Sequence, residues 1–224
     1  MFAEPENRTK VKICGITNLE DARFVSGALA DYVGFIFYPN SPRFIEPAKA
    51  GAIINWLEGP EKVGIFVNQP LDDVKSIARQ TGLDYVQLHG DESVEYCDLM
   101  EKPVIKVFHI TPDTSAENLR TSIEPYIDSV EYLLFDTKQP DKWGGTGTSF
   151  DWNVLSDLKE IKPFFLSGGL KPENIRQAIK LARPYAIDLS SGVEESPGLK
   201  DFSKIEDLFD ELRDIWDLQE MGEL

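Results

Sequence analysis

Short, almost continuous apolar segments recur along the chain, each followed by a polar or glycine-containing turn and then by a helix-like stretch. The segments are Val11–Cys14, Tyr32–Phe37, Val63–Val67, Tyr85–Leu88, Val104–Phe108, Tyr132–Phe135, Pro163–Leu166 and Tyr185–Leu189. Apolar runs of this length that do not alternate with polar residues are typical of parallel strands covered on both faces. The pattern therefore predicts eight parallel strands separated by helices.

Helix signals lie between these segments. The clearest predicted helices are Leu19–Leu29, Leu71–Gln80, Pro172–Leu181 and Glu206–Asp217. Asn18 precedes the first as a cap, Pro70 precedes the second, and the third opens with proline. Successive strands are spaced by about 25 residues, the size of one strand–helix unit. Because no low-complexity linker divides the chain, we interpret residues 1–224 as one domain in which residues 1–9 form a polar N-terminal extension.

Alternating strands and helices leave two architectures, an open doubly wound sheet and a closed barrel. Polar or glycine residues follow most predicted strands: Cys14-Gly15, Asn68, His89-Gly90, Asp136-Thr137, Ser167-Gly168-Gly169 and Ser190-Ser191-Gly192. An open sheet places its site between two strands, at one switch point, whereas a barrel collects functional residues from most strand ends. The sequence therefore predicts an α/β fold, a single-domain (β/α)8 TIM barrel with eight parallel strands.

Composition narrows the function classes. The formal net charge is −16, from 39 acidic and 23 basic residues, which disfavours binding to nucleic acid or to anionic membranes. The apolar segments are far shorter than the ~20 residues needed to span a bilayer, and the polar N-terminus does not resemble a signal peptide. The only two cysteines provide no disulfide framework, which favours the cytoplasm. We find no histidine, cysteine and aspartate cluster with metal-ligand spacing.

Glycine-rich loops follow the seventh and eighth predicted strands. Barrels often bind phosphate between these two loops through backbone N–H groups, and an acidic protein needs such local donors to hold an anion. A third glycine-rich stretch follows the sixth strand. The candidate phosphate-binding residues are Gly145, Gly147, Ser167, Gly168, Gly169, Ser190, Ser191 and Gly192. The alternative, that the glycines only form tight turns, is weakened by their presence in both loops.

Motifs at these positions resemble the phosphoribosylanthranilate isomerase family from the first strand to the eighth. They are Lys12-Ile13-Cys14-Gly15-Ile16-Thr17, Gly34-Phe35-Ile36-Phe37, Ser41-Pro42-Arg43, Val63-Gly64-Ile65-Phe66-Val67-Asn68, Gln87-Leu88-His89-Gly90-Asp91-Glu92, Gly145-Thr146-Gly147, Phe150-Asp151-Trp152, Leu166-Ser167-Gly168-Gly169-Leu170 and Asp188-Leu189-Ser190-Ser191-Gly192-Val193-Glu194. The combination of the first motif with the last is the most specific feature. The resemblance implies an enzyme of tryptophan biosynthesis.

The family reaction is an Amadori rearrangement of a phosphorylated aminoaldose to an aminoketose. It needs an acid that opens the furanose ring and a base that removes the proton on C2. The resemblance implies no cofactor and no metal, and a small phosphorylated substrate as the only partner. It leaves the oligomeric state open between a monomer and a homodimer.

By the family pattern, Cys14 resembles the general base and Asp136 the general acid. A thiol base should have a pKa below its free value of roughly 8.5, and Lys12 is a candidate source of positive charge. Asp136 must retain a proton, through burial or through a neighbouring carboxylate such as Asp188. The alternative interpretations are a small buried cysteine and an aspartate that caps a helix.

Three further residues resemble substrate ligands. Arg43 resembles the ligand of the anthranilate carboxylate, and its alternative is a surface arginine after a turn. Asp188 is expected either to contact the bridging amine or to orient Lys12 inside the barrel. His89 is expected either to contact substrate or to hold a loop, and His109, which has no matching family motif, is expected to face solvent.

The chain departs from the family pattern at Thr148, where a lysine or arginine is common, and in the loop 195–198. A rival enzyme class is another phosphosugar barrel, such as the histidine-pathway aminoaldose isomerase or a ribulose-phosphate epimerase. The former uses aspartates after strands one and five, where this chain has Cys14 and Phe108-His109. The rival outside enzymes is a binding barrel without catalysis, in which Cys14 or Asp136 would be expected to be lost.

Overall fold

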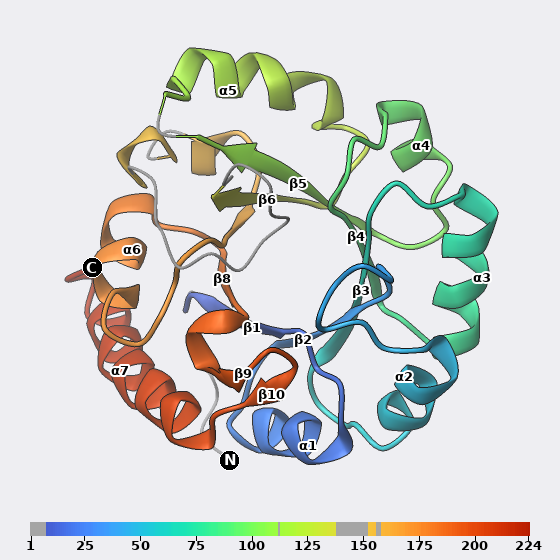
Figure 1. Ribbon diagram of the computed structural model, residues 1–224. Helices are drawn as coiled ribbons and strands as arrows, with labels where there is room; N and C mark the ends of the chain where they lie inside the picture. The colour runs from blue at the N-terminus through green and yellow to red at the C-terminus, as the bar shows by residue number, and fades with distance from the viewer. Residues whose placement is uncertain (1–7, 112, 138–151, 156–157) are drawn as a thin grey trace.

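A computed structural model describes residues 8–111, 113–137, 152–155 and 158–224. Its centre is a closed barrel of eight parallel strands (Figure 1). The strands are β1 (Lys10–Cys14), β2 (Tyr32–Ile36), β3 (Glu61–Phe66), β4 (Tyr85–Leu88), β5 (Val104–Ile110), β6 (Tyr132–Thr137), β7 (Phe164–Leu166) and β8 (Ala186–Leu189). β8 pairs with β1 and closes the ring. The predicted (β/α)8 fold is confirmed, and each predicted strand overlaps an observed one.

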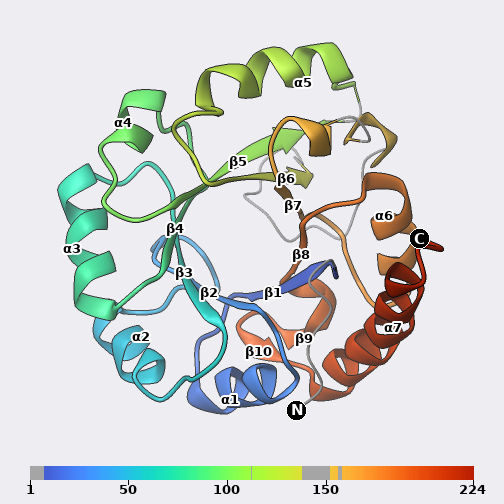
Figure 2. The same ribbon diagram turned by 180° about the vertical axis from the view of Figure 1, so that it is seen from behind.

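Helices surround the barrel on its outer side (Figures 1 and 2). They are α1 (Leu19–Gly27), α2 (Pro47–Ile54), α3 (Leu71–Thr81), α4 (Val94–Asp98), α5 (Ala116–Ile123), α6 (Ile175–Ala182) and α7 (Phe202–Glu220). Short 3-10 turns are η1 (Glu124–Tyr126), η2 (Trp152–Leu155), η3 (Leu158–Glu160) and η4 (Ser191–Val193). After β8, β9 (Glu194–Ser196) and β10 (Leu199–Lys200) form a small antiparallel pair. None of the helices in the described ranges is long and apolar enough to cross a bilayer.

Local side-chain chemistry explains where two helices begin. Asn18 caps α1 as predicted, because its Oδ1 accepts a 2.8 Å hydrogen bond from the backbone N–H of Asp21. The prediction that a helix begins at Pro172 is wrong, since α6 starts at Ile175. Asn174 instead accepts from the Lys171 backbone and donates to the Gly169 carbonyl, both at 2.9 Å. These bonds form a turn that competes with helix formation.

The alternation of side chains along each strand divides the apolar residues into two cores. On β6, Leu134 and Asp136 face the barrel interior, whereas Leu133 and Phe135 face the helices. The buried interior cluster consists of Cys14, Tyr32, Val63, Ile65, Ile105, Val107, Leu134, Phe165 and Ala186. Interior side chains become polar toward the carboxyl ends of the strands. The barrel interior is therefore filled by apolar side chains away from the carboxyl ends of the strands and is polar at those ends.

Four tyrosines cover the opposite, amino-terminal end of the barrel. They are Tyr32, Tyr85 and Tyr132, the first residues of β2, β4 and β6, and Tyr185, which immediately precedes β8. The hydroxyl of Tyr185 lies 3.1 Å from that of Tyr32 and 3.4 Å from that of Tyr132. This arrangement is expected to serve stability, because functional groups of such barrels gather at the carboxyl ends of the strands.

The part of the predicted N-terminal extension that the structure describes packs against the barrel. Arg8 is 5% exposed and makes a two-point ion pair with Asp31, with N–O distances of 2.8 and 2.9 Å. Its guanidinium also lies 4.4 Å from the ring centroid of Trp216 on α7. The indole of Trp216 donates to the carbonyl of Thr9. Arg8 and Thr9 therefore help fasten α7 to the start of β1.

Candidate active site

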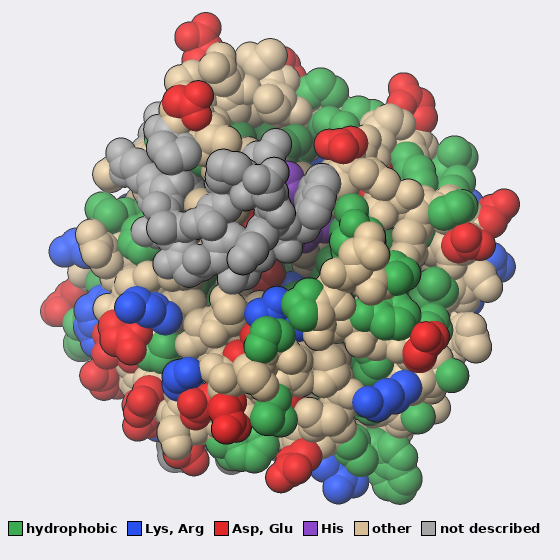
Figure 3. Space-filling view, viewed as in Figure 1, with side chains coloured by type: hydrophobic (Ala, Val, Ile, Leu, Met, Phe, Trp, Pro, Cys, Tyr) green, Lys and Arg blue, Asp and Glu red, His purple; other side chains and the backbone are tan. Residues whose placement is uncertain are grey.

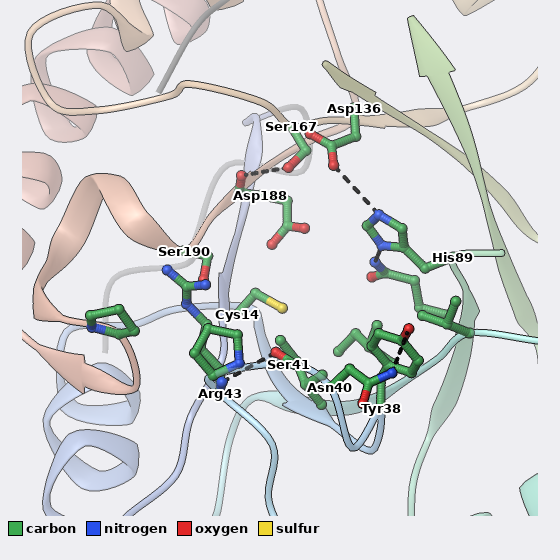
Figure 4. Close-up of a pocket in the computed structure, with 16 residues that line it drawn as sticks. Cys14, Tyr38, Asn40, Ser41, Arg43, His89, Asp136, Ser167, Asp188 and Ser190 are labelled. Carbon is green, nitrogen blue, oxygen red and sulfur yellow. Dashed lines mark hydrogen bonds and ion pairs between the residues drawn. The ribbon is translucent and has the colours of Figure 1, made fainter. Parts of the chain in front are cut away.

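A pocket of 490 Å³ opens at the carboxyl ends of the strands (Figure 4). Its polar lining consists of Tyr38, Asn40, Ser41, Arg43, Gln87, His89, Asp136, Ser167, Asp188 and Ser190, together with Cys14. The pocket brings together every predicted catalytic and substrate-binding residue. Two predicted phosphate-binding residues, Gly145 and Gly147, lie outside the described residues, as does Thr148. The volume is in the usual range for a small-molecule site.

Cys14 and Asp136 stand on different walls of this pocket (Figure 4). Cys14 is the last residue of β1 and Asp136 belongs to β6, which is three strands away around the ring through β8 and β7. Both side chains are on the inward-facing positions of their strands. A small molecule held between these walls can meet one group on each side.

Cys14 lies in a buried group of charges. The Nζ of Lys12 is 2.9 Å from Asp188 Oδ2, and the Lys12 side chain is fully buried. Burial raises the pKa of the Cys14 thiol above its usual range, although the positive charges of Lys12 and Lys200 oppose this shift. The prediction that Lys12 lowers this pKa below the free value is therefore wrong. The cost of burying a thiolate outweighs the nearby positive charge, part of which Asp188 neutralises.

Asp136 has a histidine as its neighbour. It is 3% exposed, and its Oδ2 lies 3.5 Å from His89 Nε2. On the other side of the ring, His89 Nδ1 is 3.3 Å from Gln87 Nε2. Asp188, predicted as a carboxylate neighbour of Asp136, makes its ion pair with Lys12 instead. Asp188 thus orients Lys12, one of its two predicted roles, while its position in the pocket lining keeps the other open.

A buried ion pair holds the loop that carries His89. Lys106 Nζ lies 3.0 Å from Glu92 Oε2 and donates to the Gly90 carbonyl at 2.7 Å. Glu92 in turn accepts from the backbone N–H groups of Gly90 and Asn68, at 3.0 and 2.8 Å. These charge-assisted bonds join the loops after β3 and β4, so that His89 projects from a fixed backbone.

A second buried ion pair supports Arg43. Its Nε lies 2.9 and 3.0 Å from the two oxygens of Glu194, and its Nη2 lies 2.6 Å from Glu194 Oε2. Lys200, whose side chain is fully buried, is 2.9 Å from Glu194 Oε1 and donates to the Cys14 carbonyl at 2.6 Å. Burial alone would raise the pKa of Glu194, but Arg43 and Lys200 lower it. The network connects Arg43 to the end of β1.

The two glycine-rich loops after β7 and β8 lie against each other. A side chain at Gly192 would collide with the carbonyl oxygen of Leu170, so close contact requires glycine there. Gly168 and Gly169 have φ of +90° and +68°, a conformation that glycine adopts readily. Within the described part of the chain, the N–H groups of Gly169, Ser191 and Gly192 make no hydrogen bond to another backbone carbonyl. These donors fit the predicted anion cradle.

The sequence interpretation missed one contributor to the site and misplaced a histidine outside the pocket lining. Lys200 lies 186 residues from Cys14 in the chain, and no motif in its local sequence predicts the contact. His109 was expected to face solvent, but it is half-buried and its ring centroid lies 5.1 Å from that of His89. Strand alternation could have placed His109 inside, because it shares its face with Ile105 and Val107.

Comparisons with known proteins match this architecture along nearly its whole length. The family model described as N-(5'phosphoribosyl)anthranilate (PRA) isomerase matches residues 11–211. The chain is similar to the N-(5'-phosphoribosyl)anthranilate isomerase of Acidithiobacillus ferrooxidans, with 47% identity over 197 residues that cover 88% of this chain and 93% of that protein.

Solved structures of the same family are similar to this chain. The phosphoribosyl anthranilate isomerase of Thermotoga maritima matches with a TM-score of 0.84 and 39% identity, covering 92% of this chain and 99% of that one. A phosphoribosyl anthranilate isomerase in complex with reduced 1-(o-carboxyphenylamino)-1-deoxyribulose 5-phosphate matches with a TM-score of 0.81 and 37% identity, at the same coverage.

Proposed function

This chain belongs to the N-(5'-phosphoribosyl)anthranilate isomerase family, and on that premise we propose how its residues carry out the family reaction. The resemblance drawn from the sequence motifs is confirmed. The enzyme is an isomerase of tryptophan biosynthesis. It converts N-(5'-phosphoribosyl)anthranilate to 1-(2-carboxyphenylamino)-1-deoxyribulose 5-phosphate by an Amadori rearrangement.

Asp136 acts as the general acid in this proposal. It donates a proton to the furanose ring oxygen, the bond between C1 and that oxygen breaks, and the anthranilate nitrogen forms a Schiff base with C1. The burial of Asp136 and its position in the pocket support the role, because a partly dry site strengthens a proton donor's interaction with the substrate. His89, beside Asp136, positions the carboxyl group.

Cys14 acts as the general base. Its thiolate removes the proton on C2 of the Schiff base, and the electron pair moves to give an enolamine that tautomerises to the ketone. The raised pKa of Cys14 makes the thiolate scarce at neutral pH but more basic, which suits abstraction of a proton from carbon. The position of Cys14 across the pocket from Asp136 is the single observation that carries this proposal.

The two ends of the substrate are held by separate groups. The phosphate lies against the N–H groups of the loops after β7 and β8, which supply the local donors that an acidic protein needs. The anthranilate carboxylate binds Arg43. Glu194 occupies its Nε and part of Nη2, which leaves Nη1 and the other Nη2 proton as donors toward the substrate.

The proposed activity is tested by following the fluorescence of phosphoribosylanthranilate as the purified protein consumes it. Turnover that depends on enzyme concentration supports the assignment, and no consumption contradicts it. We further propose that residues 1–224 work as one catalytic domain without a cofactor. The two free cysteines fit a reducing cytoplasm as the place of action.

The direction of the Cys14 pKa shift predicts where the thiolate forms. Cys14 works when deprotonated and Asp136 when protonated, so kcat/KM depends on both groups, whereas the thiolate can be followed by itself. Because the pKa of Cys14 is raised, the thiolate should form only above pH ~8.5, the usual thiol value. The ultraviolet absorbance of the thiolate, taken as the difference between wild type and Cys14→Ser, measures it. A thiolate that is already formed at neutral pH would contradict this direction.

Replacing Arg43 should weaken substrate binding. Arg43→Ala removes a charge-assisted contact worth about 1.5–3 kcal/mol, so KM should rise by about 10- to 100-fold with a smaller change in kcat. Arg43→Lys should recover little of this loss, because lysine cannot bind Glu194 and a carboxylate together with a planar fork. Steady-state kinetics measure both variants. Equal KM values for wild type and Arg43→Ala would remove Arg43 from the site.

A further inference from the structure

Three potential metal ligands meet at the ends of consecutive strands. They are His89 after β4, His109 on β5 and Asp136 on β6, and one ligand atom of each lies within 4.8 Å of the others. His109 pairs directly with Asp136 in the strand register. Small areas of histidine surface are visible near the centre of this face of the molecule (Figure 3).

The spacing of two of these three atoms is close to that of a zinc site. Zn²⁺ binds imidazole nitrogen and carboxylate oxygen at about 2.0–2.2 Å, so two tetrahedral ligands lie roughly 3.4 Å apart. His89 Nε2 and Asp136 Oδ2 are already 3.5 Å apart (Figure 4). A ligand atom of His109 lies within 4.8 Å of both, and His109 Nε2 is 3.4 Å from the His89 carbonyl oxygen.

The surroundings of His89 suit a metal ligand. A metal-binding imidazole usually donates its other N–H to an oxygen. Gln87 lies 3.3 Å from His89 Nδ1, and its amide oxygen is buried without a hydrogen-bond partner among the described residues. Flipping the Gln87 side-chain amide by 180° places that oxygen at His89 Nδ1. In this orientation the oxygen accepts a hydrogen bond from Nδ1–H, and His89 Nε2 keeps a lone pair that can bind a metal.

The net charge of the protein and the types of the three ligands indicate which ion would bind. Two imidazoles and one carboxylate favour Zn²⁺ and similar transition metals over Mg²⁺, which prefers oxygen ligands. The net charge of −16 attracts divalent cations in general. The pocket next to His89 and Asp136 leaves a fourth coordination position open.

We propose that His89, His109 and Asp136 form a site for Zn²⁺ or a similar transition-metal ion, and that occupation of this site inhibits the enzyme. The bound ion would hold Asp136, which then could not protonate the ring oxygen, so metal and substrate would compete. The inhibition rests on the proposed role of Asp136, whereas the binding of the ion does not. His109 does not line the pocket and has no part in the proposed isomerisation.

Calorimetric titration of the whole protein with zinc chloride tests the binding. Wild type should bind one ion, and His109→Gln should bind it more than about 100-fold more weakly, because loss of a ligand exceeds the 10–100-fold effect of losing a ligand's support. Cys14→Ser should bind zinc as wild type does. Magnesium chloride should produce no binding. Equal zinc affinity in wild type and His109→Gln, or loss of binding in Cys14→Ser, would overturn the site.

Inhibition kinetics and a crystallographic experiment complete the test of the metal site. Zn²⁺ should raise the apparent KM of wild type but not of His109→Gln, whose activity without metal should be unchanged. If His109→Gln fails to fold, anomalous scattering from zinc-soaked wild-type crystals decides, with the peak expected between the three side chains. A peak at Cys14, or no peak, refutes the proposal. Zinc binding without inhibition would uphold the metal site and refute the role of Asp136 instead.

Discussion

Replacing Cys14 by serine should lower kcat by about 10²–10⁴-fold, the usual loss when a general base is removed, with little change in KM. A serine hydroxyl is far too weakly acidic to ionise near neutrality, even beside Lys12 and Lys200. The side chain keeps nearly the same shape, so the packing against Gly34, whose added Cβ would touch the Cys14 sulfur, is preserved. The fluorescence assay of substrate consumption measures the effect.

Cys97→Ser provides the matched control. Cys97 is also buried, but it lies on α4 outside the pocket, so its replacement should affect stability and leave kcat unchanged. If Cys14→Ser keeps wild-type turnover and the same pH profile, Cys14 is only a buried thiol and the proposed mechanism is wrong.

Asp136→Asn should cause a loss of similar size, about 10²–10⁴-fold in kcat. The amide is nearly isosteric with the carboxyl group and can occupy the same place beside His89, so the pocket shape and KM should change little. It cannot, however, donate an acidic proton to the ring oxygen. Steady-state kinetics over the pH range of the wild-type assay measure the change.

Asp72→Asn serves as its control, because Asp72 is an exposed aspartate in the first turn of α3. That variant should retain full activity. Wild-type kcat in Asp136→Asn would show that another group opens the ring, and would redirect attention to His89.

Much of this site could be predicted from the sequence because alternation along a strand determines which side chains point into the barrel. Alternation along a strand places Cys14 two residues after Lys12 and Asp136 two residues after Leu134, all on the inward face. Because all eight strands are parallel, their carboxyl ends meet at one rim. The fold and the pocket membership of the strand-end residues could therefore be predicted once the eight apolar segments were recognised, whereas Arg43 was placed by the family resemblance.

The features of the site that could not be predicted from the sequence depend on contacts made in the folded chain. Lys200 reaches the Cys14 carbonyl from the small β9–β10 pair, and Glu194 binds Arg43 across 151 residues of chain. The direction of the Cys14 pKa shift depends on the balance between burial and charge, and only the folded site shows that burial outweighs Lys12. The start of α6 depends on Asn174, whose side chain holds the preceding loop.

The central claim is that Asp136 acts before the C2–H bond breaks and that Cys14 breaks it. The primary isotope effect on kcat, measured with substrate deuterated at C2, tests this order directly. In Cys14→Ser, proton abstraction should limit the rate and the isotope effect should be large. In Asp136→Asn, the earlier ring opening should limit the rate and the effect should be close to unity. Equal effects in the two variants, or the reverse pattern, would contradict the assignment.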